Sequence, residues 1–127
     1  MTHQRTTHLK PILGGTLLSR LRAQSGDRDP IVHAKYIQPW EGGRVYYLFE
    51  LHTDPDTREC LTALDPSTPC GYAVLPLRWL EESRGPMGER PHLDPGFTPI
   101  RREALIDELD WRCPPEICQE CWRAWGD

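Results

Sequence analysis

The sequence lacks the long apolar segments of membrane-anchored and secreted proteins. No stretch approaches the roughly 20 apolar residues that a membrane-spanning helix needs. The N-terminus is not followed by the apolar segment of a secretory signal peptide. We therefore expect a cytoplasmic protein with no membrane contact.

Signatures of common catalytic sites are also missing. The sequence contains no G-x-S-x-G, H-E-x-x-H, Walker or dinucleotide-binding pattern. The Gly14-Gly15 pair is not followed by the Lys-Ser or Lys-Thr that a phosphate-binding loop requires. A binding protein is therefore favoured over an enzyme.

Methionine and phenylalanine are scarce, with two of each, but five tryptophans and four tyrosines supply large apolar groups for a core. The 127 residues are the size of one ordinary domain. Thirteen prolines and ten glycines indicate that turns and loops occupy much of the chain. We expect a single domain over residues 1–127, with a flexible arm at 1–11, a core at 12–105 and a helical extension at 106–127.

The net charge of −4 is unevenly distributed along the chain. Residues 1–44 carry seven Lys and Arg against three Asp and Glu, whereas residues 103–127 carry two against seven. The first block would favour an acidic partner and the last a basic one. A solvated surface of ordinary composition accounts for both blocks equally well, so charge alone names no partner.

Hydrophobic patterning predicts one helix, then four strands, then further helices. Strands are expected over residues 31–38, 44–52, 58–64 and 72–75. Helices are expected over 16–23 with Thr16 as N-cap, over 76–84, from the N-cap Thr98 onward, and over 115–125. This order predicts an α+β fold, in which a four-stranded antiparallel sheet has helices on one face and the C-terminal helix carries cysteines.

Several short motifs occur in a fixed order that resembles a known family. They are Asp29-Pro30-Ile31-Val32-His33-Ala34-Lys35-Tyr36, Val45-Tyr46-Tyr47 with Glu50, Gly71-Tyr72, Leu77, Leu80-Glu81, Arg84-Gly85-Pro86-Met87-Gly88 and Phe97-Thr98-Pro99. Over residues 12–105 the chain resembles domain-of-unknown-function family 2958, small bacterial and phage proteins carried on plasmids and other mobile elements. The resemblance implies a compact α+β domain and a mobile-element setting, and it implies no reaction.

The chain departs from that family at three places. Asp54-Pro55-Asp56 stands where the family usually has an Asp-Gly turn, and Cys60-Leu61 stands where it has Phe-Gly. Glu89-Arg90 is followed by Pro91, where the family tends to have Asp. The cysteine-rich segment over residues 113–121 lies outside the shared region.

Cys113, Cys118 and Cys121 form the sharpest local signal, with the spacing Cys-x4-Cys-x2-Cys. The last two lie on one face of the predicted final helix, and Cys113 precedes its start. Three thiolates and a fourth ligand would hold one structural zinc ion. Cys60, Cys70 or His92 would supply the fourth ligand.

Buried thiols or a redox pair would account for the same cysteines without a metal. Ile117, Trp122 and Trp125 make an apolar helical stripe with Cys118 and Cys121, which is typical of buried thiols in a core. A single disulfide or redox pair is the remaining alternative. The number of cysteines is five, which argues against a complete disulfide framework.

A polar cluster on the sheet is the one catalytic hypothesis. His33 and Lys35 would share a face of the first strand, and Glu50 or His52 would come from the next one. Such a cluster could perform acid–base chemistry. The outward polar face of a one-sided sheet would produce the same pattern.

Residues 85–99 hold four prolines and three glycines, and arginines and aromatic residues flank them. This composition is typical of protein contacts, and with Trp79 it would also suit nucleic acid. Glu81, Glu82, Glu89 and Asp94 would repel phosphate, and a loop that merely packs over the sheet is the plain alternative. The partner-binding residues that we predict are Arg84, Met87, Arg90, Phe97, Arg101 and Arg102.

The predicted function is that of a non-catalytic accessory protein of a mobile element. It would bind a protein partner within a defence, counter-defence or nucleic-acid-processing complex. A nucleic-acid-binding subunit is the alternative, and a small hydrolase built on His33, Lys35 and Glu50 is a distant third.

Overall fold

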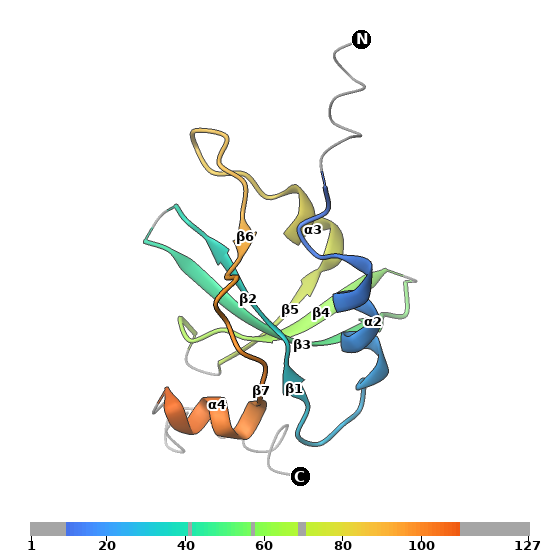
Figure 1. The fold of residues 1–127 in the computed structure, drawn as a ribbon. Helices are drawn as coiled ribbons and strands as arrows, with labels where there is room; N and C mark the ends of the chain where they lie inside the picture. The colour runs from blue at the N-terminus through green and yellow to red at the C-terminus, as the bar shows by residue number, and fades with distance from the viewer. Residues whose placement is uncertain (1–9, 41, 57, 69–70, 110–127) are drawn as a thin grey trace.

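The computed structural model describes residues 10–40, 42–56, 58–68 and 71–109, and the ribbon is drawn in Figure 1. Its helices are α2 (Gly15–Ala23), α3 (Leu77–Glu82) and α4 (Arg102–Glu108). Its strands are β1 (Ile31–Val32), β2 (Ala34–Gln38), β3 (Arg44–Thr53), β4 (Glu59–Leu64), β5 (Tyr72–Pro76), β6 (His92–Leu93) and β7 (Ile100–Arg101).

The main sheet has five antiparallel strands in the order β5-β4-β3-β2-β6, so the expected number of four is wrong. The four predicted strands form a meander, and β6 adds to its free edge by pairing Leu93 with Tyr36 and His92 with Ile37. Because β6 has two residues inside a proline-rich segment, it has no alternating pattern to reveal it. The mixed helix and antiparallel sheet agree with the predicted α+β class.

The predicted strand over 31–38 divides at His33. The part before the break, β1, pairs with β7 in a separate two-stranded sheet, while β2 pairs with β3. The backbone N–H of His33 donates to the carbonyl of Leu48 at 3.1 Å. Val32 belongs to one buried cluster whereas Ala34 and Tyr36 belong to the other, so the break turns the chain from one face to the opposite face.

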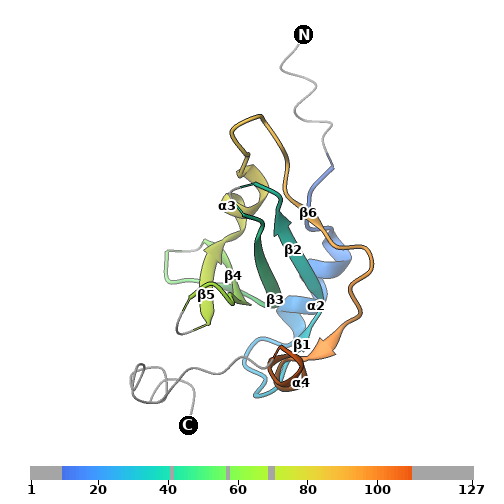
Figure 2. The ribbon, with the colours of Figure 1, turned by 90° about the vertical axis from the view of Figure 1, so that its left-hand side faces the viewer.

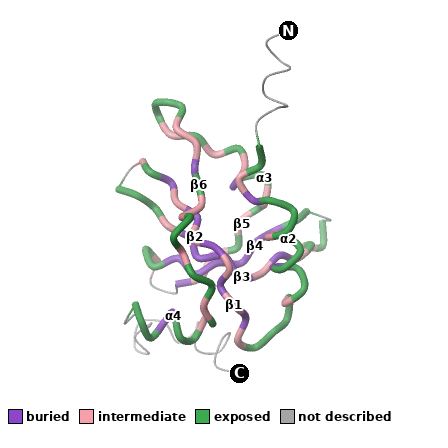
Figure 3. The backbone as a smooth tube through the Cα atoms, in the orientation of Figure 1, coloured by how far each residue is buried: buried purple, intermediate pink, exposed green. Residues whose placement is uncertain are grey.

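Both faces of the sheet are covered, and the expected single covered face is therefore wrong. Along β3, Tyr46 and Leu48 belong to the first cluster, whereas Tyr47 and Phe49 belong to the second. The helices α2 and α3 pack against the first cluster, and α4 packs against the second. Figure 3 shows buried residues concentrated along the central strands.

Two helix starts differ from the sequence expectation. The helix α2 begins after Gly14, which has an extended backbone, so Thr16 is not its cap. The helix α4 begins at Arg102, because Ile100 and Arg101 pair with β1. The carboxylate of Asp29 accepts the backbone N–H of Glu103 at 3.1 Å, so the cap comes from a distant segment. The predicted cysteine-bearing helix lies outside the described residues.

Gln24 fastens the end of α2 to the sheet. Its Nε2 donates to the carbonyls of Ile31 at 2.5 Å and Phe49 at 2.7 Å, and its Oε1 accepts the N–H of Ile31 at 3.2 Å. One amide thus satisfies three backbone groups of two strands.

None of the helices in the described ranges is long and apolar enough to cross a membrane.

Candidate binding cleft beside the α3–β6 loop

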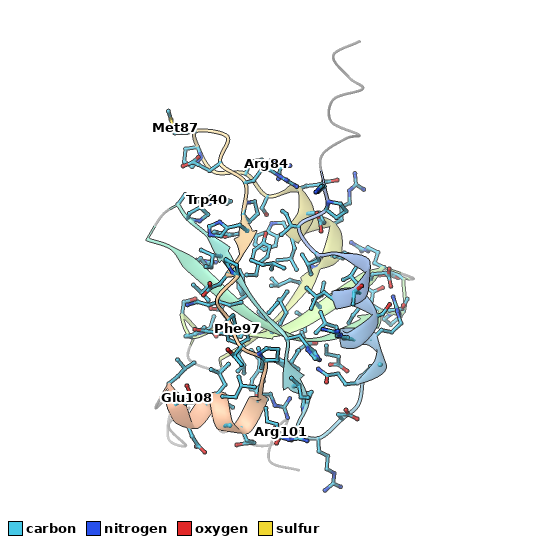
Figure 4. The ribbon with its side chains drawn as sticks, viewed as in Figure 1. Trp40, Arg84, Met87, Phe97, Arg101 and Glu108 are labelled. Carbon is cyan, nitrogen blue, oxygen red and sulfur yellow. The ribbon has the colours of Figure 1, made fainter. Side chains whose placement is uncertain are left out.

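The six predicted partner-binding residues do not form one surface. They divide between the loop from α3 to β6, near one end of the sheet, and the segment before and at the start of α4, near the other end (Figures 1, 2 and 4). The first group is Arg84, Met87 and Arg90, and the second is Phe97, Arg101 and Arg102.

The second group makes contacts within the protein. The ring of Phe97 lies 5.9 Å from that of Tyr47. The guanidinium of Arg102 lies 4.9 Å from the centre of the Phe49 ring and donates to the carbonyl of Arg28 at 2.5 Å. Arg101 donates to the carbonyl of Asp29, 3.2 Å away. These contacts make the three residues parts of the α4 packing.

Arg84 of the first group lines a cleft between the β2–β3 turn and α3, which we call the tryptophan cleft. Its volume is about 370 Å³, and it is lined by Gln38, Trp40, Arg44, Trp79, Ser83 and Arg84. Figure 4 labels Trp40 and Arg84, which lie below and beside the loop that carries Met87. The sequence does not predict Gln38, Trp40 and Arg44 as site residues, because Pro39-Trp40 reads as an ordinary turn and Trp79 lies 39 positions farther on.

Buried aromatic residues set the position of the cleft wall. The rings of Tyr36 and Tyr46 are 6.1 Å apart, and Trp79 meets Tyr46 edge-on at 6.2 Å. The hydroxyl of Tyr36 donates to the carbonyl of Leu80 at 2.5 Å, which fixes α3 on the sheet. Burial raises the pKa of Tyr36 to about 12, so the hydroxyl keeps its proton.

Gln38 carries a buried hydrogen-bond donor that has no partner. The residue is 5% exposed, and its Nε2 makes no hydrogen bond of regular geometry, although a weaker side-chain hydrogen bond from Gln38 lowers the pKa of Tyr36 and offsets part of the effect of burial. A buried amide without a partner is costly, so such groups are rare in proteins. Gln38 also lines the cleft, so a bound ligand would satisfy this donor only after the side chain turns toward it.

Like the amide of Gln38, the charged groups of the cleft are hydrogen-bond donors. Nη1 of Arg44 donates to the hydroxyl of Tyr46 at 3.3 Å. Nη1 of Arg84 donates to the carbonyls of Glu81 at 3.0 Å and Ser83 at 2.7 Å. Among the described residues that line the cleft, none carries a carboxylate. The lining therefore suits a ligand that is rich in acceptors and negatively charged.

The loop above the cleft is closed by its own hydrogen bonds. The N–H of Gly85 donates to the carbonyl of Glu89 and the N–H of Gly88 donates to that of Gly85, both at 2.9 Å, and the N–H of Met87 donates to Oε1 of Glu89 at 2.7 Å. Gly88 has φ +82°, and a Cβ on Gly85 would lie 2.8 Å from the ring of Trp40. The side chain of Met87 is 88% exposed on this ordered tip.

A second cavity, of about 530 Å³, shares Arg84 with the tryptophan cleft. Lys10 and Arg90 also line it, and Arg90 donates to the carbonyl of Lys10 at 2.8 Å. Its acidic residue, Glu81, accepts the backbone N–H groups of residues 12 and 13, each at 2.8 Å. Cationic side chains thus continue from the cleft across Arg84.

The structure divides the predicted acid–base cluster. Glu50 and His52 line a cavity of about 510 Å³, while Lys35 lines another and lies 5.9 Å from the centre of the Tyr47 ring. The carboxylate of Glu50 accepts from Ser25 and Gly26 at 2.9 and 3.0 Å. Burial, with the charge of Arg20, lowers the pKa of His33. His33, Lys35 and Glu50 therefore do not share one site.

The predicted zinc ligands Cys113, Cys118 and Cys121 lie outside the described residues. Within the described residues, no group of three His, Cys, Asp or Glu side chains is placed to hold a metal ion. Cys60 is buried with its Sγ 3.7 Å from the Oδ2 of Asp54, and burial raises the pKa of its thiol.

Comparisons with known proteins found no matching family model, no matching curated protein and no matching solved structure.

Proposed function

We propose that this chain is a non-catalytic accessory protein that binds a protein partner through Met87. The observation that carries the proposal is an apolar side chain, 88% exposed, at the tip of a loop that three internal hydrogen bonds hold in one shape. Methionine adapts to the shape of an apolar pocket, and an ordered loop loses little entropy on binding. The partner would offer an apolar pocket to this side chain.

The setting that we propose is a plasmid, phage or other mobile element, in a defence, counter-defence or nucleic-acid-processing complex of the cytoplasm. It is supported by the resemblance of residues 12–105 to domain-of-unknown-function family 2958. Arg84-Gly85-Pro86-Met87-Gly88, one of the motifs that carry this resemblance, forms the loop tip itself.

The test is co-purification of the full chain from cells that carry the gene, with nuclease and about 0.5 M salt to remove phosphate contacts. We expect one stoichiometric protein with the natural chain and at least tenfold less with Met87→Ser. Val74→Ser is the matched control, because Val74 is 60% exposed on β5 and lies away from the loop. Equal recovery with Met87→Ser would contradict the proposal.

We also propose that Cys113, Cys118 and Cys121 hold one structural zinc ion. The support is their spacing. Protein purified without chelator is expected to contain one equivalent of zinc, and Cys118→Ser to lose it. Protein without zinc, and a Cys118→Ser variant that only unfolds more easily, would leave the cysteines as packing residues.

A further inference from the structure

We propose that the tryptophan cleft binds one nucleotide of a single-stranded nucleic acid, with the following phosphates at Arg84 and the adjoining cavity. This site is separate from the Met87 contact and does not depend on it. It assigns a ligand class to the cleft, whose lining combines two indole rings with two guanidiniums and an amide.

The size and lining of the cleft fit a nucleotide. A carboxylate alone would leave most of about 370 Å³ empty, whereas a flat ring joined to an anion would fill it. Trp40 and Trp79 supply indole rings, and Trp79 is 41% exposed. Indole rings are good stacking partners for nucleobases of any sequence.

The hydrogen-bonding groups of the cleft match the same ligand. Gln38 lies on the lining, and its amide would meet an acceptor on a base edge once the side chain turns toward the cleft, because its Nε2 is inaccessible in the unliganded protein. The guanidiniums of Arg44 and Arg84 lie on the same lining and are typical phosphate contacts. A ring, an acceptor edge and a phosphate are the parts of one nucleotide.

The neighbouring cavity gives the strand a path out of the cleft. Because Arg84 lines both cavities, phosphates that leave the cleft would meet Lys10 and Arg90 next. About three phosphates would be neutralised, and each contact of a single strand contributes about −0.7 to the slope of log affinity against log salt concentration. The expected slope is therefore about −2.

The acidic residues near this path are already engaged. Glu81 accepts two backbone N–H groups, Glu82 pairs with Arg78 at 3.0 Å, and Glu89 accepts the N–H of Met87. Glu82 and Glu89 line neither cavity, and Glu81 lines only the adjoining one. The two backbone N–H groups that Glu81 accepts partly offset its charge there, so its repulsion weakens the phosphate contacts without preventing them.

The experiment is fluorescence anisotropy with a labelled twelve-residue oligo-dT in low salt, using the full chain. We expect Gln38→Leu and Arg84→Gln each to weaken binding at least tenfold. Arg78→Gln is the matched control, with less than a twofold effect, because Arg78 is an exposed arginine of α3 that lines neither cavity. Arg84 is exposed, so its variant keeps the test valid if Gln38→Leu does not fold.

An abasic strand and three competitors identify the group that is bound. An abasic strand of equal length should bind at least tenfold more weakly than oligo-dT, and thymidine monophosphate should compete where inorganic phosphate does not. Equal binding of the abasic strand would overturn the nucleotide site in favour of a simple anion site. Equal competition by polyglutamate would overturn it in favour of an acidic protein segment.

Absence of oligo-dT binding, or equal binding by all variants, would also overturn the proposal. The Met87→Ser variant separates the two proposals, because it should lose the protein partner and keep oligo-dT affinity within twofold. Loss of both ligands by Met87→Ser would contradict two separate sites.

Discussion

Arginine and aromatic side chains gather near both ends of the sheet, but the groups around them differ. Near α4, the guanidinium of Arg102 lies over the rings of Phe49 and Tyr72, and the cavity that it lines also contains Asp27 and Glu50. In the tryptophan cleft, the described lining has guanidiniums and an amide but no carboxylate.

This difference separates packing from binding. At the α4 end, Arg102 stacks on two rings and donates to a backbone carbonyl, so it stabilises the fold, although its buried Nε has no hydrogen-bond partner. The described lining of the tryptophan cleft has donors and no carboxylate, so an anionic ligand would meet no like charge among those lining residues. Composition does not distinguish the two, because Arg next to an aromatic residue occurs at both ends.

The largest expected change in the free energy of unfolding comes from substituting aromatic residues at the two ends. Phe49→Ala should lower the free energy of unfolding by about 4 kcal/mol, because Phe49 is 2% exposed and its loss leaves a cavity. Trp79→Ala should cost about 1 kcal/mol, since Trp79 is 41% exposed. Urea denaturation measures both, and equal losses would contradict the distinction between a packed end and an open one.

The next effect compares one substitution at two glutamines. Gln24→Leu should cost about 2 to 3 kcal/mol, because it leaves two carbonyls and one N–H without their partner. Gln38→Leu should leave the free energy of unfolding unchanged or raise it by up to about 1 kcal/mol, since the amide Nε2 that it removes has no partner. Chemical denaturation of the unliganded proteins checks this. A large loss with Gln38→Leu would show that the amide stabilises the fold.

A smaller effect compares two arginines. Arg102→Ala should cost about 2 kcal/mol, through its lost ring contacts and its hydrogen bond to the Arg28 carbonyl. Arg84→Ala should cost less than about 0.5 kcal/mol, because its contacts are at the surface. Thermal unfolding of the two variants measures the difference, and the reverse order would break the comparison.

The smallest effect is a pH dependence of the free energy of unfolding that arises from His33, the residue between β1 and β2. Its pKa in the folded state is below the usual value of about 6.5, through burial first and Arg20 second. The unfolded chain therefore binds the proton first, and the free energy of unfolding falls as the pH drops below about 6.5. From pH 7.5 to 5.5, the natural protein should lose more stability than His33→Gln in urea titrations. Parallel losses would remove His33 as the cause.

The sequence predicts the parts of the fold whose own residues determine them. The strand β3 follows from the continuous run of apolar and aromatic residues from Val45 to Phe49, and α2 follows from its leucines. The break at His33, the strand β6 and the cap of α4 by Asp29 do not follow from it. Each of these depends on a hydrogen-bond or strand partner 15 to 74 positions away. The pattern of neighbouring residues carries no information about such a partner.

The candidate site follows from the sequence in part. Of the six residues that the loop composition predicts, Arg84 lines the cleft and Arg90 lines the cavity beside it. Phe97, Arg101 and Arg102 lie near α4, so the six do not form one surface. Gln38 carries no sequence signal, because its significance arises from burial without a hydrogen-bond partner in the folded state.

The segment that carries Met87 is held at both of its ends by one residue of the sheet, Tyr36. Tyr36 donates to the carbonyl of Leu80 before the loop and pairs with Leu93 after it. The fold therefore closes at Tyr36, and the residues between follow an excursion that the sheet does not require. The closure entropy of such a loop changes by only about 0.6 kcal/mol when its length doubles. The main cost of exchanging the segment is therefore the loss of its own contacts, such as those of Glu81 with the backbone of residues 12 and 13 and of Arg90 with Lys10.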